Sequence, residues 1–380
     1  MRPAKSDAKR RLKDSDLVSF VPMEDLTIDQ KFLEPQQERK LSQVSGSYTY
    51  FANGDVLLAK ITPCFENGKL GVARNLTNGI GFGSSEYIVL RPGDSLDGEY
   101  LYYFLLQDSF RAEGRKTMSG AVGHKRVSKE FIERLQIPVP SLSEQQRIVA
   151  SLDEAFAGLA TITANAEKNL NNARELFNSY RNSIFSHGWE KKTLGDVCEN
   201  LDSKRVPVTK RYRKAGTIPY YGASGAVDFV DDFIFDEDLL LVSEDGANLV
   251  MRNYPIAFSI TGKSWVNNHA HVLRFEDLAS QKFIEYYLNS ISLKPYVNGM
   301  AQPKLNQKAL HSIPVPFPPL NDRKRAVTNL DELAMQAERL QRAYEARIAA
   351  FGELKQSILQ RAFTGELTSP PTRAIEEAAE

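Results

Sequence analysis

An internal repeat is the feature of this sequence that most limits what the chain can fold into. Asp55–Leu58 matches Asp238–Leu241, a shift of 183 residues from position 55 to position 238. The motif Ile-Pro-Val-Pro occurs at residues 137–140 and again at residues 313–316. Because matches at a fixed spacing indicate one structural unit built twice, the sequence predicts two similar halves related by a pseudo-two-fold repeat.

The first part of each half has the pattern of short strands joined by turns. Tyr87–Leu90 and His271–Leu273 are apolar runs rich in residues that favour strands. Turn-forming pairs such as Asn53-Gly54 and Pro92-Gly93 separate these runs. We therefore expect a mixed, loop-rich α+β domain at the start of each half.

A long helix is predicted after each Ile-Pro-Val-Pro motif, because proline is excluded from a helix interior and the apolar period changes there. Ser143 followed by Gln146 has the spacing of a capping box, which predicts Ser143 as the N-cap of the first helix. Glu144 suits the positive end of the helix dipole. The second helix is expected to end at Thr364-Gly365, where glycine can provide the cap.

Apolar residues in both predicted helices recur at alternating steps of three and four, which is the seam of a coiled coil. Neither helix can cover its seam alone, and each follows a globular part. We therefore expect an antiparallel pair within the chain, with a coiled coil between two copies as the alternative. The predicted core of the helix pair is Leu152, Phe156, Leu159, Leu170, Phe177, Leu330, Leu333, Leu340, Phe351 and Leu354.

Length and charge restrict the class of protein. A chain of 380 residues suits two cores rather than one. With 48 Lys and Arg against 48 Asp and Glu the net charge is zero, so a polyanion could bind only at a local basic site. Cys64 and Cys198 fit neither a disulfide framework nor a zinc site. We found no export signal and no membrane span, and a cytoplasmic protein is expected.

No catalytic motif is complete, so we expect no enzymatic activity, no cofactor and no metal. Thr261–Ser264 resembles the end of a phosphate-binding loop, but the required earlier glycine is replaced by Ala257. An Asp-Pro-Pro-Tyr loop of the kind used for adenine methylation does not occur. His269 and His271 share a strand face but lack further ligands nearby in sequence, which favours a structural or surface pair.

Basic residues gather late in the first globular part and at both ends of the second. Such clusters are usually solvated surface, but their recurrence in both repeats favours contact with DNA phosphates. The candidate DNA-binding residues are Arg115, Lys116, Lys125, Arg126, Lys204, Arg205, Arg211, Arg213, Lys214 and Lys304.

Several further motifs accompany the two Ile-Pro-Val-Pro segments. They are Tyr102-Tyr103-Phe104, Glu285-Tyr286-Tyr287, Ser143–Val149, Trp189–Val197, Gly262–Asn268 and Ala362–Leu367. Together with two variable globular domains and two matched helices, these motifs make the chain similar to the specificity (S) subunit of type I restriction–modification systems. The resemblance covers nearly the whole chain.

This resemblance implies a non-catalytic subunit with two target recognition domains, each reading half of a bipartite site in double-stranded DNA. It also implies that the helices set the spacer and dock two adenine methyltransferase subunits, which restriction subunits that translocate and cut DNA then join. A helical scaffold that binds protein without reading DNA is the alternative.

The expected organisation alternates domains and helices. The first recognition domain is expected at residues 1–140, its helix at 141–188, the second domain at 189–318, its helix at 319–367 and a flexible tail at 368–380. One departure from the family pattern is that Trp189–Val197 has no counterpart ahead of Phe20. We therefore expect a first domain that lacks its opening strand, either because the start codon is assigned late or because the protein is a natural truncation.

Overall fold

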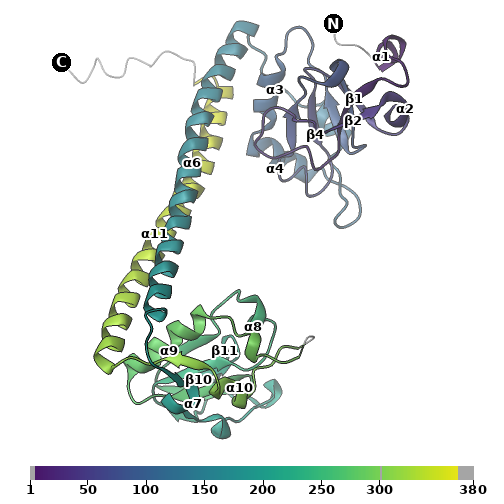
Figure 1. Ribbon diagram of the computed structural model, residues 1–380. Helices are drawn as coiled ribbons and strands as arrows, with labels where there is room; N and C mark the ends of the chain where they lie inside the picture. The colour runs from purple at the N-terminus through teal and green to yellow at the C-terminus, as the bar shows by residue number, and fades with distance from the viewer. Residues whose placement is uncertain (1–4, 300–301, 367–380) are drawn as a thin grey trace, which may run out of the picture. The chain divides into compact units, whose positions relative to one another are not determined.

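The computed structural model describes residues 5–299 and 302–366, and the expected tail at 368–380 lies outside them. The chain divides into two compact units (Figure 1). Unit 1 combines Met1–Ala166 with Ala346–Glu380, and unit 2 is Glu167–Glu345. Each unit therefore contains one globular part and one half of each long helix.

Unit 1 contains two small sheets. The first has the strand order β2-β1-β6-β3, with β1 at Leu17–Val21, β2 at Gln37–Lys40, β3 at Thr49–Ala52 and β6 at Ile80–Gly83. The second has the order β5-β4-β7, with β4 at Val56–Ala59, β5 at Leu70–Val72 and β7 at Tyr87–Leu90. The helices of the globular part are α1 (Lys5–Arg11), α2 (Leu41–Val44), α3 (Gly98–Leu105), α4 (Asp108–Lys116) and α5 (Lys129–Glu133), with a 3₁₀ turn η1 (Thr77–Gly79).

Unit 2 contains two corresponding sheets and a short additional one. The first has the order β11-β10-β15-β12, with β10 at Ala215–Gly222, β11 at Gly225–Val230, β12 at Phe235–Asp236 and β15 at Lys263–Val266. The second has the order β14-β13-β16-β9, with β9 at Glu199–Asn200, β13 at Leu239–Ser243, β14 at Ala257–Ile260 and β16 at Ala270–Arg274. The third pairs β8 (Lys191–Thr193) with β17 (Pro314–Pro316).

The remaining elements of unit 2 are short helices, apart from α9. They are α7 (Leu194–Val197), α8 (Asn248–Met251), α9 (Leu278–Ser290) and α10 (Gln307–His311), with 3₁₀ turns η2 (Asp202–Lys204), η3 (Lys210–Tyr212) and η4 (Lys294–Tyr296).

The two units share one topology, which confirms the repeat predicted from the sequence. Strands β1, β2, β3 and β6 take the same places in their sheet as β10, β11, β12 and β15. The parallel pairing of β1 with β6 recurs as that of β10 with β15. The antiparallel set β5-β4-β7 recurs as β14-β13-β16. The predicted strand Tyr87–Leu90 is β7, and His271–Leu273 lies within β16.

The second Ile-Pro-Val-Pro segment is better covered than the first. Strand β8 pairs with it as β17, and Val315 is 0% exposed. Among the described residues of unit 1 no strand includes residues 137–140, and Val139 is 51% exposed. The segment Trp189–Val197, for which the sequence offers no match ahead of Phe20, is the one that supplies this cover in unit 2.

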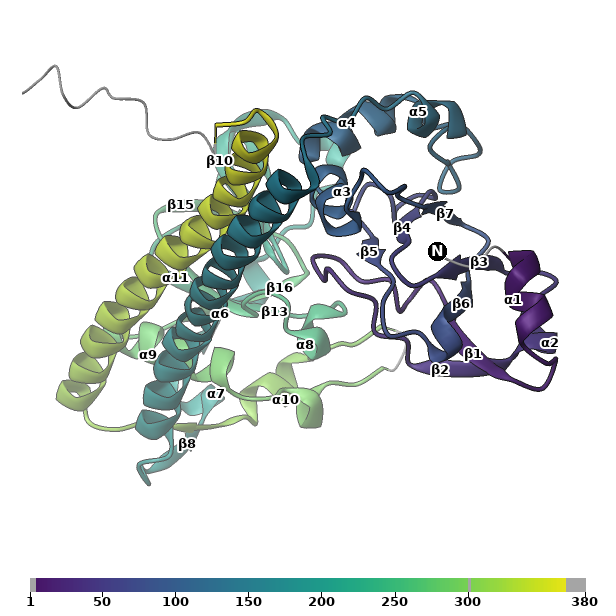
Figure 2. The same ribbon diagram turned by 90° about the horizontal axis from the view of Figure 1, so that it is seen from above.

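The long helices α6 (Leu142–Phe185) and α11 (Leu320–Phe363) have 44 residues each and run side by side (Figures 1 and 2). In unit 1 the start of α6 packs with the end of α11, because Ile148, Leu152 and Leu359 share one apolar core. In unit 2 the end of α6 lies against the start of α11, where Asn329 Nδ2 donates to Tyr180 Oη at 3.0 Å. The predicted antiparallel pair is therefore confirmed.

The ends of the long helices differ slightly from the sequence prediction. Helix α6 begins at Leu142, and the Glu144 N–H donates to Ser141 Oγ at 3.3 Å. Ser141 rather than Ser143 is therefore the capping residue, because the helix begins two residues earlier than the capping box suggested. At the other end, α11 stops at Phe363 and Gly365 has a left-handed φ of +84°, as predicted.

The seam of α6 follows the predicted stepping, with Leu152 buried and Phe156, Leu159, Leu170 and Phe177 partly buried. In α11, Leu330 is buried and Leu333 and Phe351 are partly buried. The prediction is wrong for Leu340 and Leu354, which are each 46% exposed.

Two polar side chains occupy the positions that the prediction gave to those leucines. After Ala337 and Phe351 the seam steps by four residues rather than three, to Gln341 and Lys355. Lys355 packs over the ring of Phe156 while its ammonium reaches Asp29 at 2.5 Å. A long side chain can cover an apolar seam and keep its charge at the surface. A pattern based on polarity alone therefore assigned these two seam positions to the wrong residues.

Leu330 and Leu340 provide a matched test of this seam. We expect Leu330→Ala to lower the free energy of unfolding by about 3 kcal/mol, because it leaves a cavity at a fully buried site. Leu340→Ala removes the same atoms from an exposed site and should cost less than about 1 kcal/mol. Chemical denaturation of both variants of the full chain measures the difference, and equal losses would contradict the observed seam.

Candidate nucleic-acid interface

Each unit has one hairpin loop at the same place in the fold, with a basic residue at its base. In unit 1 the loop runs from Ser119 to Arg126, whose backbones exchange hydrogen bonds at 3.1 and 2.9 Å. In unit 2 the described arms of the loop are residues 298–299 and 302–304, and the backbones of Asn298 and Lys304 exchange hydrogen bonds at 2.9 and 2.8 Å. We call these segments hairpin 1 and hairpin 2.

Both hairpins are attached to equivalent strand ends. The Val127 N–H, directly after hairpin 1, donates to the Lys60 carbonyl beyond β4 at 2.9 Å. The Leu305 N–H, directly after hairpin 2, donates to the Glu244 carbonyl beyond β13 at 2.8 Å. Because β4 and β13 are repeat equivalents, the fold places a basic hairpin at the same sheet edge twice.

The base of hairpin 1 carries a charge pair at the surface. Arg126 makes a bidentate contact with Glu86, at 2.7 and 2.9 Å, and this hydrogen bonding lowers the pKa of the Glu86 carboxyl. Lys125 beside it is exposed, and Val122 at the tip is almost fully exposed. The other two unit 1 candidates, Arg115 and Lys116, are exposed at the end of α4, where Lys116 contacts Glu113.

In unit 2 most candidates of the run from 202 to 214 are exposed. Lys204, Arg211 and Lys214 face solvent, and Arg211 packs over the exposed ring of Tyr212. Arg213 is different, because it is largely buried and contacts Asp228 at 2.9 Å while stacking over Tyr220. Arg213 therefore lies beneath the basic surface and supports it.

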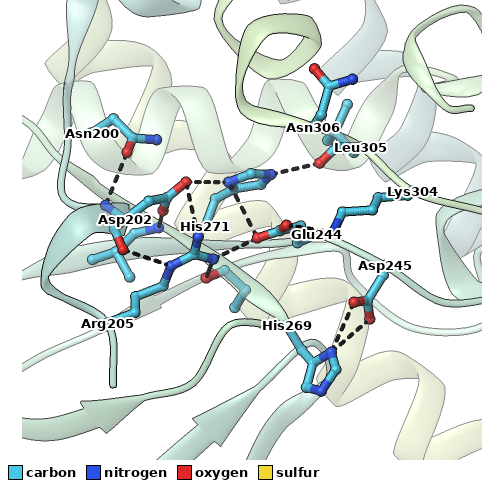
Figure 3. A network of polar contacts seen from close by, with 12 residues as sticks. Asn200, Asp202, Arg205, Glu244, Asp245, His269, His271, Lys304, Leu305 and Asn306 are labelled. Carbon is cyan, nitrogen blue, oxygen red and sulfur yellow. Dashed lines mark hydrogen bonds and ion pairs between the residues drawn. The ribbon is translucent and has the colours of Figure 1, made fainter. Parts of the chain in front are cut away.

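Arg205 is also directed inward, toward a cluster of charged residues under hairpin 2 (Figure 3). Its side chain is 13% exposed and donates to Glu244 Oε2 at 2.6 Å and to the Ala270 carbonyl at 2.8 Å. Lys304 approaches the same carboxylate, with Nζ 3.1 Å from Oε1, but its side chain is 57% exposed. Arg205 therefore anchors the cluster and Lys304 forms its outer edge.

Three members of this cluster are residue types that bind metals. Oxygens of Asp202 and Glu244 and a ring nitrogen of His271 lie within 4.8 Å of one another. However, His271 Nδ1 lies 2.6 Å from Asp202 Oδ2, which is a hydrogen-bond distance, and Arg205 and Lys304 already contact Glu244. The donor set is thus paired with cations of the chain, and a divalent ion would have to displace them.

Electrostatics keeps both carboxylates of the cluster ionised. Burial acts to raise the pKa of Asp202, but hydrogen bonds from His271 and the Val272 N–H, with the charge of Arg205, leave it below its ordinary value. The pKa of Glu244 is lowered in the same way, by Arg205, His271 and Lys304 against the effect of burial. The cluster is a compensated ionic network inside unit 2.

Sequence reasoning found the basic residues of this surface but missed the carboxylates that hold them. Glu86, Asp228 and Glu244 are distant in sequence from the arginines that they contact. Asp202 begins the segment 202–214, which contains six basic residues and one acid. That single acid was the one sequence signal that a carboxylate holds the basic residues. His271 was interpreted as a structural histidine, and its two ring contacts agree with that interpretation.

Comparison with known families now adds to this geometry. The family model described as "Type I restriction modification DNA specificity domain" matches residues 24–172 and again residues 186–346. The chain belongs to this family. The two matches correspond to the two repeats, which confirms the resemblance to specificity subunits that the motifs indicated.

Curated relatives and solved structures agree with this assignment. A putative type I restriction enzyme specificity subunit of Haemophilus influenzae is 35% identical over 144 residues, and the EcoAI specificity subunit of Escherichia coli is 40% identical over 137 residues. These alignments cover 38% and 36% of this chain but only 37% and 23% of the two relatives.

Two solved chains show the same fold over nearly the full length. One, from work on complex assembly and conformational transition of a type I R-M system, has a TM-score of 0.75 at 20% identity and covers 96% of this chain and 95% of its own. The HsdS subunit from Thermoanaerobacter tengcongensis has a TM-score of 0.58 at 20% identity, with coverage of 96% and 94%. In the part of this chain that the structure describes, no helix has the length and apolar character needed to cross a bilayer.

Arg205 should matter for stability in a way that Arg211 does not. Arg205→Ala leaves the buried carboxylate of Glu244 short of a cation, and we expect it to lower the free energy of unfolding by about 3 kcal/mol. Arg211→Ala, at an exposed position nearby, should change it by less than about 0.5 kcal/mol. Chemical denaturation compares the two, and equal stability would show that the cluster contributes nothing.

The pH dependence of unfolding gives a second measurement. Because the folded pKa values of Asp202 and Glu244 lie below their ordinary values of 3.8 and 4.5, their stabilisation is complete above those values and is lost as the pH falls through the folded ones. Stability should therefore decline below about pH 4.5 in the wild type, and less steeply in Arg205→Ala, whose reference stability is already reduced.

Proposed function

We propose that this chain is the DNA-recognition subunit of a type I restriction–modification complex and carries no catalytic role itself. Each globular part reads one half of a bipartite target in double-stranded DNA. The observation that carries the proposal is the recurrence, at the same sheet edge in both units, of a hairpin with a basic residue at its base, Arg126 or Lys304. A protein that reads two half-sites needs two equivalent DNA-contact surfaces, whereas a protein-binding scaffold that does not read DNA needs none.

The exposed basic residues suit phosphate contact rather than base reading. Lysine and arginine on a surface position a protein on DNA, while polar side chains read the base edges. Lys125 and Arg126 of hairpin 1, Lys304 of hairpin 2, and Lys204, Arg211 and Lys214 lie at the surface. Arg115 and Lys116 extend the basic surface of unit 1. Arg205 and Arg213 are held by carboxylates, and we propose that they support the interface without touching DNA.

The helix pair serves assembly and spacing in this proposal. At 1.5 Å per residue, 44 residues extend for roughly 66 Å, and the seam is covered within the chain. Apolar side chains remain exposed on the outer faces, among them Ile162, Leu176 and Met335. We propose that these faces dock two adenine methyltransferase subunits, which restriction subunits then join in the cytoplasm.

Salt dependence tests the DNA contact. Removing one phosphate contact, as in Arg211→Ala, Lys214→Ala or Lys125→Ala, should weaken binding to all duplex sequences alike and lower the slope of log affinity against log salt by about one. The matched control is Lys168→Ala, which removes the same charge from an exposed position on α6. Binding measured across a salt series gives the slopes, and an unchanged slope in the three variants would oppose the proposal.

Spacer length tests the role of the helices. One heptad inserted into each helix, after Asn169 in α6 and after Ala343 in α11, keeps the seam in phase and adds about 10 Å. Mapping methylated adenines in a host that carries the complete system should show unchanged half-sites separated by about three more base pairs, at roughly 3.4 Å each.

The control for this insertion is the same heptad added after Phe363, where α11 ends. That variant should methylate the original spacing. If the doubly inserted chain also modifies the original spacing, the helices do not set the distance between half-sites.

A further inference from the structure

His271 lies at the centre of the charged cluster beneath hairpin 2 (Figure 3). It belongs to β16 and its side chain is 1% exposed. Nδ1 lies 2.6 Å from Asp202 Oδ2, and Nε2 lies 2.7 Å from the carbonyl oxygen of Leu305. Leu305 directly follows hairpin 2, so one ring connects the sheet to the base of that loop.

The two partners of the ring determine its protonation. A carbonyl oxygen can only accept, so Nε2 must donate to Leu305. The Asp202 carboxyl accepts from the Val272 N–H at 2.8 Å and lies 3.5 Å from the Arg205 guanidinium, contacts that favour the ionised form, which also only accepts. Neutral imidazole has one N–H, and two donated hydrogen bonds therefore require the imidazolium.

The charged neighbours are consistent with this cation. The groups that face the ring are Asp202 from η2, Glu244 after β13, Arg205 after η2 and Lys304 from hairpin 2. The thiol of Cys198, whose pKa burial raises to about 12, faces Asp202 and is neutral. With His271 protonated, three cations face two carboxylates and the cluster has one net positive charge.

We infer that His271 is held as a doubly hydrogen-bonded imidazolium and that this cation positions hairpin 2 for contact with DNA. The inference rests on the proposed function for its DNA part, while the state of the ring and its effect on the loop stand independently. Without the second donated bond, either Asp202 or the Leu305 carbonyl faces a nitrogen lone pair. Loss of that proton also lowers the net charge of the cluster beneath Lys304.

Unit 1 supplies an internal comparison. The shift of 183 residues that aligns the repeats places Ile88 of β7 where β16 has His271. Hairpin 1 is thus held by its backbone bonds and by the Arg126–Glu86 pair, with an aliphatic side chain at the histidine position. The His271 contacts are therefore specific to unit 2, and the effects of removing them should be confined to that unit.

The state of the ring can be measured without a mutation. Nitrogen NMR of the full chain labelled at histidine should show both ring nitrogens of His271 protonated at pH 7. The His271→Asn variant assigns the signals. A neutral His271 ring at pH 7 would overturn the inference, and so would loss of the Nδ1 proton when zinc ions are added at micromolar concentration.

Amide hydrogen exchange tests the effect on the loop. In His271→Asn the amides of Lys304 and Leu305 should exchange at least about ten-fold faster, while those of Arg126 and Val127 in unit 1 keep their rates. The matched control is His269→Asn, which removes a 51% exposed ring that contacts Asp245 and lies just before β16. Unchanged exchange at Leu305, or an equal rise in both units, would overturn the positioning role.

DNA binding completes the test. His271→Asn should lose about ten-fold in discrimination at one half-site and keep discrimination at the other, whereas His269→Asn resembles the wild type. If wild type and both variants bind DNA without any salt dependence, the proposed function fails while the NMR and exchange results still decide the state of His271. If both half-sites lose discrimination equally, the positioning role is wrong.

Discussion

A hydrogen bond from a tyrosine to an aspartate on a long helix joins the globular part to the helices in each unit, with Tyr103 buried and Tyr286 half-buried. Tyr103 donates to Asp153 in unit 1, and Tyr286 donates to Asp331 at 2.6 Å in unit 2. Burial and this hydrogen bond raise the pKa of both tyrosines, so the hydroxyls remain donors over the whole physiological range. Because each aspartate follows the leucine that fills the seam, Leu152 or Leu330, the contact that orients a domain is placed directly on the most buried part of the helix pair.

A second contact also joins a long helix to the globular part in both units, but through a different side chain in each. Gln145 is fully buried and bonds the Pro140 carbonyl while accepting from the N–H of Asp97, the residue that caps α3. Its repeat equivalent, Arg323, donates to the Pro318 carbonyl and lies 3.8 Å from Asp277, the residue that caps α9. An amide and a guanidinium thus make the same connection from the start of the helix to the cap of the domain helix. Geometry at this joint has been kept while the side chain has changed.

The sequence could predict what depends on local or periodic patterns. The repeat, the strand Tyr87–Leu90, the antiparallel helices and the glycine cap at Gly365 all follow from spacing and backbone chemistry. Leu340 and Leu354 were misplaced because a heptad can step by three or four, and only the packing of Lys355 over Phe156 decides the second case. The ionic cluster could not be predicted, because Asp202, Glu244 and His271 meet through the pairing of β16 with β13 on one side and β9 on the other. Basic residues in a loop look alike in sequence, and only their burial separates Arg205 from Lys204.

The repeat also explains why the two halves can differ in how they hold their hairpin loops. Each hairpin needs a fixed base, and both units obtain it first from the same backbone bonds to the end of a central strand. What lies beneath that base is free to vary, because the strand fold and the joint to the helices are already determined elsewhere. Unit 1 fills the space with an aliphatic residue and a surface ion pair, and unit 2 fills it with a buried network around His271. A duplicated scaffold whose globular parts are each fixed at a tyrosine joint can therefore change one loop surface without disturbing the other, which is what the proposed reading of two half-sites physically requires.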